Sequence, residues 1–384
     1  MNKALNKNNW QTKKLGEVLE YEQPSLYIVS SKNYKDDYET PVLTAGKSFI
    51  LGKTKEKNGI FPKDKLPVII FDDFTTATKF VDFPFKVKSS AMKILHSVKN
   101  ISDAKFLFHL MQNISFDHTG IHKRYWISEY SKIEILLPPL PEQHRIVKIL
   151  DDVFEKMAKA KENAKKNLQN AKELFESYLQ NIFANPGKDW EEETLNNICI
   201  VERGSSPRPI KKFITNNSDG VNWIKIGDTK NIDRYLYTTR QKITKEGAEK
   251  SRYVKEGDLI ISNSMSFGRP YIMKTSGYIH DGWFVLRPNA NIHPEFFYDL
   301  LSSPQIQKQI TILASGAVVK NISGDLIKKV ILPIPTITEQ KSIVAKLSNF
   351  SAETKKLEAI YKQKLADLEE LKKSVLKKAF NGKL

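Results

Sequence analysis

Apolar residues recur every three or four positions along two long stretches of the chain, and this spacing predicts two long amphipathic helices, over residues 142–184 and 339–384. Each stripe contains one pair of consecutive four-residue steps, which is typical of a stutter in a coiled coil. We therefore expect the two helices to pack on one another. The apolar positions are Leu150, Val153, Met157, Ala160, Ala164, Leu168, Ala171, Phe175, Tyr178 and Ile182, followed in the second helix by Leu347, Phe350, Leu357, Tyr361, Leu365, Leu368, Val375 and Ala379.

Both helices have recognisable start signals. Pro141 lies in the first turn of one helix, and Thr338 is the expected N-cap of the other. Short connections to the neighbouring segments favour antiparallel packing. At about 1.5 Å per residue, the first helix is expected to be roughly 64 Å long.

The segments before each helix have the patterns of short strands and short helices. Apolar runs at 68–71, 133–137, 258–261 and 330–332 predict strands, and residues 103–112 and 294–302 predict helices at matching places. The expected fold class is α+β: two mixed α/β domains separated by two long antiparallel helices that form a coiled coil. The expected boundaries are 1–141 and 185–338 for the domains, and 142–184 and 339–384 for the helices.

The second half of the chain repeats the first. A shift of 197 residues places Glu142-Gln143 on Glu339-Gln340 and Phe183 on Phe380, whereas a shift of 180 places Trp10 on Trp190. Seventeen residues have therefore been added within the second copy. Such a repeat predicts a pseudo-two-fold axis, and duplex DNA is a partner of matching symmetry.

Charge supports the same partner. The chain has a formal charge of +17, distributed as +6, +1, +5 and +5 over the four segments 1–141, 142–184, 185–338 and 339–384. Both mixed domains are basic while the first helix is nearly neutral, which favours two polyanion-binding surfaces joined by a spacer. Residues 1–141 contain a single arginine and residues 185–338 contain seven, so the second domain is the better candidate for a guanine-rich half-site.

Cys199 is the only cysteine, which excludes an intramolecular disulfide and a cysteine-rich zinc cluster. The first ten residues lack the apolar core of a signal peptide, and no run of 18 apolar residues occurs. We expect a cytoplasmic protein without a membrane span.

Motifs for chemistry are missing from the sequence. It contains neither the Asn/Asp-Pro-Pro-aromatic tetrapeptide of a methyltransferase nor a Walker-type phosphate loop. Acid and lysine pairs such as Asp103 with Lys105 are expected by chance in so charged a chain, and Asp72-Asp73 is better explained as a solvated or hydrogen-bonding turn than as a metal site. We therefore expect no catalytic residue, cofactor or metal.

Candidate DNA contacts are small hydroxyl residues beside cations, and Gly-led basic loops at matching places in the two halves. Such groups suit phosphate contacts and base-edge hydrogen bonds, although solvated loops have the same composition. Trp10 and Trp190 begin each repeat and are better explained by core packing than by base stacking. The candidates are Thr75, Thr76, Thr78, Lys79, His122, Lys123, Arg124 and Tyr125 in the first domain, and Ser205, Ser206, Arg208, Ser264, Ser266, Arg269, Lys320 and Asn321 in the second.

Two related motifs mark the places where the helices begin, LLPPLPEQ at 136–143 and LPIPTITEQ at 332–340, although Thr338 replaces Pro141. Further distinctive segments are FDDFT at 71–75, KSSAMKIL at 88–95, GSSPRP at 204–209 and WIKIGD at 223–228. Through these motifs, and over essentially its whole length, the chain resembles the DNA-specificity subunit of type I restriction-modification systems.

The resemblance implies a subunit without chemistry of its own. Such a subunit reads a split sequence in double-stranded DNA through two target-recognition domains. It also scaffolds two modification (methyltransferase) subunits, which motor-nuclease restriction subunits join. Two other functions stay open: a stand-alone DNA-binding repressor or architectural protein with a coiled-coil stem, and a DNA methyltransferase with degenerate motifs.

Overall fold

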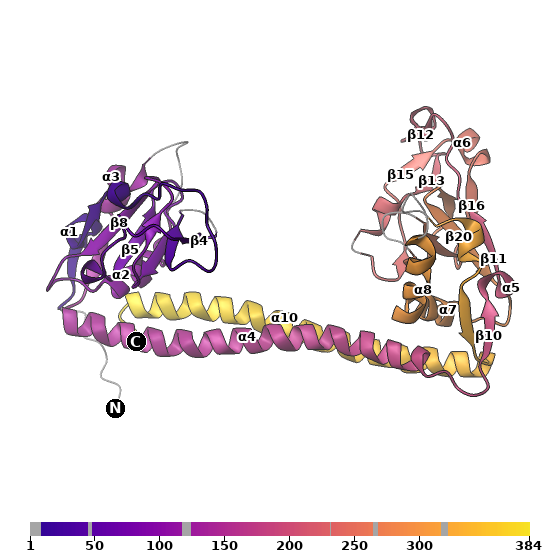
Figure 1. The fold of residues 1–384 in the computed structure, drawn as a ribbon. Coiled ribbons are helices and arrows are strands. Elements are labelled where there is room, and N and C mark those ends of the chain that lie inside the picture. The colour runs from indigo at the N-terminus through magenta and orange to yellow at the C-terminus, as the bar shows by residue number, and fades with distance from the viewer. Residues whose placement is uncertain (1–8, 45–47, 117–123, 231, 264–267, 316–321) are drawn as a thin grey trace. The chain divides into compact units, whose positions relative to one another are not determined.

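The computed structural model describes residues 9–44, 48–116, 124–230, 232–263, 268–315 and 322–384. The chain divides into two compact units (Figure 1). Unit 1 comprises Met1–Lys165 and Gln363–Leu384, and unit 2 comprises Lys166–Lys362. Each unit therefore contains one mixed domain and the adjacent part of both long helices.

The two long helices are α4, Leu140–Ala184, and α10, Ile337–Phe380. Pro141 lies in the first turn of α4, as expected, but α10 begins at a different residue from the one that the sequence predicted. There the Thr336 hydroxyl accepts the Glu339 backbone N–H at 3.4 Å, and Thr338 lies inside the first turn. The prediction of Thr338 as N-cap was wrong because Ile337 already takes a helical conformation, so the capping position falls one residue before it.

Within each unit the two helices run antiparallel. In unit 1, Arg145 near the start of α4 donates to the Leu384 carbonyl at 2.9 Å, and further along Lys161 pairs with Glu369. The ammonium of Lys372 lies 5.5 Å from the centre of an aromatic ring of α4. In unit 2 the rings of Tyr178 and Phe350 lie 4.4 Å apart. Increasing residue number along α4 meets decreasing number along α10, as the sequence predicted.

Unit 1 has a four-stranded antiparallel sheet, a three-stranded sheet and a two-stranded pair. Apolar cores line the first two sheets and extend to the end of α10. In spatial order the strands are β2 (Leu19–Glu22), β8 (Met92–Ser97), β5 (Val68–Asp72) and β6 (Thr78–Val81); β4 (Ile50–Thr54), β3 (Thr40–Leu43) and β7 (Lys86–Val87); and β1 (Gln11–Lys14) with β9 (Glu134–Leu137). The short helices are α1 (Leu15–Val18), α2 (Ala104–Met111) and α3 (Tyr125–Ser128).

Unit 2 contains two five-stranded sheets and a two-stranded pair. In spatial order the strands are β11 (Cys199–Arg203), β20 (Trp283–Pro288), β17 (Leu259–Ser262), β18 (Pro270–Met273) and β14 (Tyr235–Leu236); β12 (Ile214–Thr215), β15 (Gln241–Ile243), β13 (Val221–Ile224), β19 (Gly277–Ile279) and β16 (Arg252–Val254); and β10 (Glu191–Thr194) with β21 (Ile331–Ile334). The helices are α5 (Leu195–Ile198), α6 (Lys245–Glu249), α7 (Pro294–Ser302), α8 (Pro304–Ser315) and α9 (Gly324–Ile327).

The repeat seen in the sequence is a structural repeat. β1 pairs with β9 so that Gln11 faces Leu137, and β10 pairs with β21 so that Glu191 faces Ile334. These partners are related by the two shifts of 180 and 197 residues. In both units this pair joins the first strand of the domain to the strand that leads into a long helix.

A buried glutamine fixes each domain to the start of its helix. The Gln143 side chain accepts the Asp103 N–H at 2.8 Å and donates to the Ile101 and Pro138 carbonyls at 2.9 and 2.8 Å. Gln340 repeats this arrangement with His293 N–H and two carbonyls. Both glutamines are fully buried. Because a buried amide must have partners, the Glu-Gln repeat has a structural explanation.

The tryptophan at the start of each repeat packs against the core. The Trp190 indole N–H donates to Glu339 at 3.0 Å, and its ring lies edge-on to Phe183 and Phe296. Trp10 is half-buried against the core of unit 1. Packing, as predicted, accounts for both. Among the helices of the described residues, none is long and apolar enough to cross a membrane.

Candidate nucleic-acid interface

The first group of candidate residues spans the turn between β5 and β6, which carries Thr75 and Thr76, and the start of β6, which carries Thr78 and Lys79. The Asp72 carboxylate accepts the backbone N–H groups of Phe74 at 2.9 Å and Thr75 at 3.2 Å. Thr76 has a φ of 58°, in the left-handed region that bulky residues avoid. These bonds fix the turn. Thr75 and Lys79 are exposed, whereas Thr76 and Thr78 are half-buried.

Asp73 connects this turn to the start of α3. Its backbone carbonyl accepts the Tyr125 N–H at 3.0 Å, and its carboxylate accepts the Trp126 N–H at 2.9 Å. The ammonium of Lys93 lies 3.6 Å from the same carboxylate, and both side chains are buried. Breaking such a buried pair on one side leaves an uncompensated charge. Asp73 thus holds the exposed Arg124 beside the turn that carries Thr75 and leads into β6.

Asp72 and Asp73 are hydrogen-bond acceptors rather than solvated groups. They are 6% and 2% exposed, and their carboxylates bind backbone N–H groups. The described residues contain no group of three or more His, Cys, Asp or Glu side chains arranged to hold a metal. The sequence predicted that Asp72 and Asp73 are either solvated or hydrogen-bonded, and the structure shows hydrogen bonds.

Tyr125 differs from the expectation that it contacts DNA. The side chain is 2% exposed, and its ring packs edge-on against Phe116. Its neighbour Trp126 is buried with it because α3 turns both aromatic side chains into the core. The assignment of Tyr125 as a DNA contact was therefore wrong. His122 and Lys123 lie outside the described residues.

Unit 2 repeats the connection between turn and helix. The Asn263 carbonyl accepts the Ile322 N–H at 3.3 Å, as the Asp73 carbonyl accepts the Tyr125 N–H. Asn263 N–H donates to Gly282, and Asp73 N–H donates to Ala91. The β17–β18 turn and the approach to α9 therefore correspond to the β5–β6 turn and the approach to α3. The candidates Ser264, Ser266, Lys320 and Asn321 lie outside the described residues.

The remaining candidates of unit 2 lie after β11 and at the start of β18. Ser206 donates to the Asp281 carboxylate at 2.7 Å, and Arg208 lies 3.5 Å from the same carboxylate while 84% of its side chain stays exposed. Ser205 donates to the Lys250 carbonyl at 2.9 Å. Arg269 is exposed and donates to a backbone carbonyl at 3.1 Å. Asp281 therefore brings Ser206 and Arg208 together, whereas Arg269 is held separately.

A cavity of about 810 Å³ adjoins the loop that carries Ser206 and Arg208. Lys211 and Lys225 line it together with Arg208, against the single carboxylate of Asp281. This excess of positive charge suits a DNA phosphate or a guanine edge. Sequence reasoning missed Lys225 because β13 brings it to this loop from elsewhere in the chain. The local signals were the basic run from Arg208 to Lys212 and the segment at 223–228, which contains Lys225.

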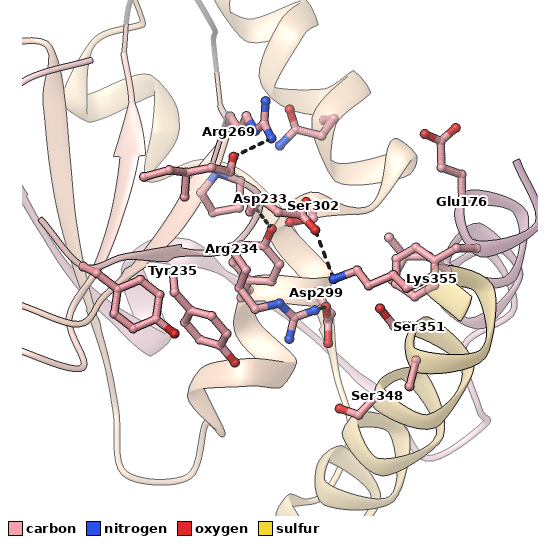
Figure 2. A pocket seen from close by; sticks show the side chains of 18 of the residues that line it. Glu176, Asp233, Arg234, Tyr235, Arg269, Asp299, Ser302, Ser348, Ser351 and Lys355 are labelled. Carbon is pink, nitrogen blue, oxygen red and sulfur yellow. Dashed lines mark hydrogen bonds and ion pairs between the residues drawn. The ribbon is translucent and has the colours of Figure 1, made fainter. Parts of the chain in front are cut away.

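A larger cavity of about 1110 Å³ lies between the domain of unit 2 and its helices (Figure 2). Three cations and three carboxylates line it, namely Arg234, Arg269, Lys355, Glu176, Asp233 and Asp299. Because the acidic groups offset most of this positive charge, the cavity attracts a phosphate backbone less than the cavity beside Arg208 does. It marks the packing of the domain on the helices rather than a DNA surface.

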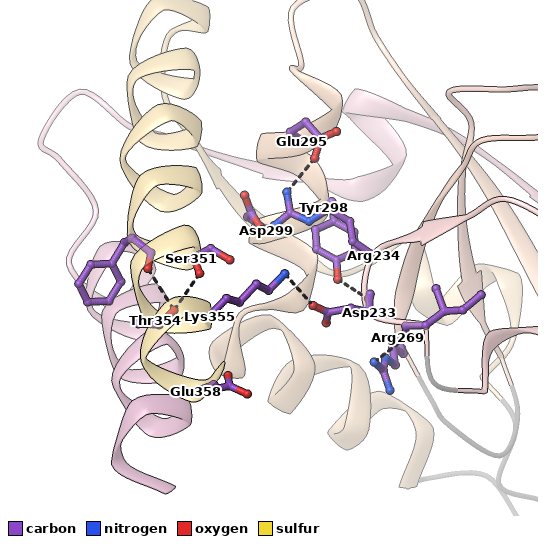
Figure 3. A network of polar contacts seen from close by, with 12 residues as sticks. Asp233, Arg234, Arg269, Glu295, Tyr298, Asp299, Ser351, Thr354, Lys355 and Glu358 are labelled. Carbon is purple, nitrogen blue, oxygen red and sulfur yellow. Dashed lines mark hydrogen bonds and ion pairs between the residues drawn. The ribbon is translucent and has the colours of Figure 1, made fainter. Parts of the chain in front are cut away.

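The polar network at this cavity joins β14, α7 and α10 (Figure 3). Arg234 donates to Glu295 at 2.7 Å and to Asp299 at 2.5 Å, and Tyr298 donates to the Asp233 carbonyl at 2.9 Å. Lys355 reaches Asp233 at 3.3 Å, but both side chains are well exposed. The exposed Lys355–Asp233 pair therefore contributes little to the attachment, whereas Arg234 is half-buried and bonds to the buried Asp299.

The chain matches the family model described as type I restriction modification DNA specificity domain twice, over residues 7–169 and 187–369. A curated relative is the specificity subunit of the type I restriction enzyme EcoR124I/EcoR124II of Escherichia coli, at 34% identity over 88% of this chain and 86% of the relative. The specificity subunit of the MjaVIII enzyme of Methanocaldococcus jannaschii is 23% identical, over 98% of this chain and 93% of the relative.

Solved structures share the fold at lower identity. The HsdS subunit from Thermoanaerobacter tengcongensis has a TM-score of 0.62 at 20% identity, with 98% of each chain covered. A chain from a structural study of complex assembly and conformational transition of the type I R-M system has a TM-score of 0.77, also at 20% identity and with 99% of each chain covered. These likenesses concern the fold.

Proposed function

The chain belongs to the type I restriction modification DNA specificity family, and on that premise we propose that it is a specificity subunit that binds a bipartite sequence in double-stranded DNA. It performs no chemistry itself. It scaffolds two modification (methyltransferase) subunits, and motor-nuclease restriction subunits join that assembly. The proposed location is the cytoplasm, where the host DNA lies.

One observation supports recognition of a two-part DNA sequence: the same connection between a turn and a short helix occurs in each unit. Asp73 with Tyr125 in unit 1 and Asn263 with Ile322 in unit 2 make the same backbone hydrogen bond. Each unit thus offers one recognition surface. The proposed modules are residues 1–141 and 185–338 for recognition, with 142–184 and 339–384 as spacer helices.

The proposed contacts follow the surfaces described above. Exposed cations suit phosphates and guanine edges, while hydroxyl groups suit other base edges. The first half-site is assigned to Thr75, Thr76, Thr78, Lys79 and Arg124, with His122 and Lys123. The second half-site is assigned to Ser205, Ser206, Arg208 and Arg269, with Ser264, Ser266, Lys320 and Asn321, to which the cavity adds Lys211 and Lys225.

Reconstituted methylation tests this function. The purified chain, its host's methyltransferase subunits and the two together are incubated with host DNA and S-adenosylmethionine, and methylated positions are then sequenced. We expect methyl transfer only from the combination, at two short half-sites separated by a fixed spacer. Methyl transfer by the chain alone would show an enzyme. Specific binding to DNA without any stable association with the methyltransferase would favour a stand-alone repressor.

A further inference from the structure

Two large apolar side chains of unit 1 are exposed on the β5–β6 turn and on α3, the two segments that Asp73 joins. Phe74 is 42% exposed and Ile127 is 51% exposed. Phe74 directly follows Asp73, which binds the N–H groups of Tyr125 and Trp126, and Ile127 is the next residue of α3. The hydrogen bonds of Asp73 therefore hold the turn that carries Phe74 against the helix that carries Ile127, and we call these two exposed side chains the Phe74–Ile127 surface.

The backbone at both residues is fixed independently of their side chains. Phe74 N–H binds the Asp72 carboxylate at 2.9 Å, and α3 is held at Asp73. Neither side chain belongs to an apolar core formed by the described residues. An exposed phenylalanine on a rigid turn gains little from folding, but it loses little conformational entropy on binding.

The chemistry of the major groove suggests what such a surface contacts. Among the four bases, only thymine presents a methyl group at this edge, and apolar side chains recognise it by contact. We infer that the Phe74–Ile127 surface contacts a thymine methyl group in the first half-site. This inference rests on the proposed function and assigns two specificity-determining residues to it.

Unit 2 differs at both equivalent positions. Asp73 corresponds to Asn263, a shift of 190 residues, and the same shift places Phe74 on Ser264. Tyr125 corresponds to Ile322, a shift of 197 residues, and this shift places Ile127 on Gly324. The second domain thus has no large apolar residue at either position. Recognition of a methyl group through this surface belongs to the first half-site alone, which provides a control within the same complex.

Deoxyuridine tests the inference because it lacks only the C5 methyl group of thymine. Duplexes that carry the host motif are titrated with the specificity subunit assembled with its methyltransferase subunits. Deoxyuridine in the first half-site should weaken binding about fourfold for each contacted methyl group, the effect expected from losing the burial of one methyl. Phe74→Ala and Ile127→Ala should each weaken binding to the thymine duplex. The double variant should bind thymine and deoxyuridine duplexes equally.

Two controls accompany the titration. Deoxyuridine in the second half-site should leave affinity within about twofold, and Leu26→Ala, which removes an aliphatic side chain of unit 1 that is 76% exposed, should change neither affinity nor sensitivity to deoxyuridine. Circular dichroism establishes that each variant is folded, and assembly with the methyltransferase is measured separately.

Several results would overturn the inference. They are a first half-site without thymine on either strand, a wild-type complex indifferent to deoxyuridine there, or a double variant that keeps full sensitivity. Loss of methyltransferase assembly in a folded variant that keeps this sensitivity would show instead that the surface docks a protein partner. If the wild-type complex binds no bipartite site at all, the proposed function itself fails.

Discussion

His109 and Asp299 occupy equivalent positions on α2 and α7, and both are buried titratable side chains. Burial lowers the pKa of His109 to about 4. Burial raises the pKa of Asp299 to about 7, although Arg234 beside it opposes the shift. Each unit therefore favours a neutral side chain at this position, but the two units should respond to pH in opposite directions.

The first prediction concerns these opposite responses. His109 has a folded pKa below its unfolded value of 6.5, so unit 1 should lose stability as pH falls from about 6.5 toward 4. Asp299 has a folded pKa above 3.8, so its contribution is complete below pH 3.8 and is lost as pH rises through about 7. These pKa differences correspond to a change on the order of 3 to 4 kcal/mol in each unit.

Hydrogen exchange between pH 4 and 8, corrected for intrinsic rates, resolves the two units. His109→Gln should flatten the pH dependence of unit 1 only, and Asp299→Asn that of unit 2 only. Equal pH profiles in wild type and variants would show that these side chains titrate as in the unfolded chain.

A second prediction separates two roles for the basic residues before α3. If Arg124 reads a base edge, Arg124→Ala should weaken binding to the specific site by about 1 to 3 kcal/mol and leave binding to random DNA intact. If it binds a phosphate, both affinities should fall, and the salt slope should decrease by about one unit. Lys123→Ala is tested in the same way, and titrations at several salt concentrations distinguish the roles. Unchanged affinity and slope for both variants would remove this loop from the interface.

At the site, residue type was a partial guide. Of the residues chosen as small hydroxyls beside cations, Thr75 on the turn and Lys79 in β6 are exposed, and their role in DNA binding stays a prediction. The structure adds Asp73, whose hydrogen bonds reach Trp126 across 53 residues, and no local pattern indicates such a bond. Tyr125 was misassigned for the same reason, because sequence proximity to Arg124 does not show which side chain faces the core.

At the scale of elements, each buried glutamine ties one domain to one helix. Truncating Gln143 or Gln340 to alanine leaves a buried N–H and two buried carbonyls without this partner. We expect Gln143→Ala to destabilise unit 1 and Gln340→Ala to destabilise unit 2, each by about 1 to 3 kcal/mol. Gln363→Ala is the matched control because that exposed side chain bonds only to Asp367 one turn away.

Unit-resolved hydrogen exchange measures the outcome. Protection should fall in the unit that contains the altered glutamine and stay constant in the other unit. If the Gln143 and Gln340 variants lose no more protection than the Gln363 variant, the two buried glutamines do not hold the domains to the helices.

Elements with a strong local pattern were predictable. Residues 294–302 form α7 as predicted, and 68–71 lie within β5. The pairing of strands into sheets was not predictable from the sequence, because pairings such as parallel β13 with β19 join strands more than fifty residues apart.

The large cavity of unit 2 was not predictable from the sequence either. Ser348 and Ser351 line this cavity, and the repeat relates them to Asp151 and Phe154 of unit 1. The sequence shows this difference in side chains, but only the packing in three dimensions shows that a cavity lies beside them.

At the scale of the whole molecule, α4 and α10 each contribute to both units. If the helices set the spacer between half-sites, one heptad added to each helix between the units should lengthen that spacer by about 10 Å, or about three base pairs. Neither half-site should change. Sequencing of the methylated motif reads the result directly, and an unchanged spacer in a folded, active variant would contradict a ruler role. A heptad in one helix only should instead impair assembly, because it breaks the register between the helices.

The central claim is that each unit reads its own half of a bipartite sequence, and exchange of one recognition domain tests it most directly. Residues 185–338 are replaced by the equivalent region of a relative with a known target, and the chimaera is expressed with the methyltransferase subunits. Sequencing of methylated DNA should then show one new half-site, with the other half-site and the spacer retained. A motif in which both half-sites change, or neither does, would contradict independent recognition by the two units.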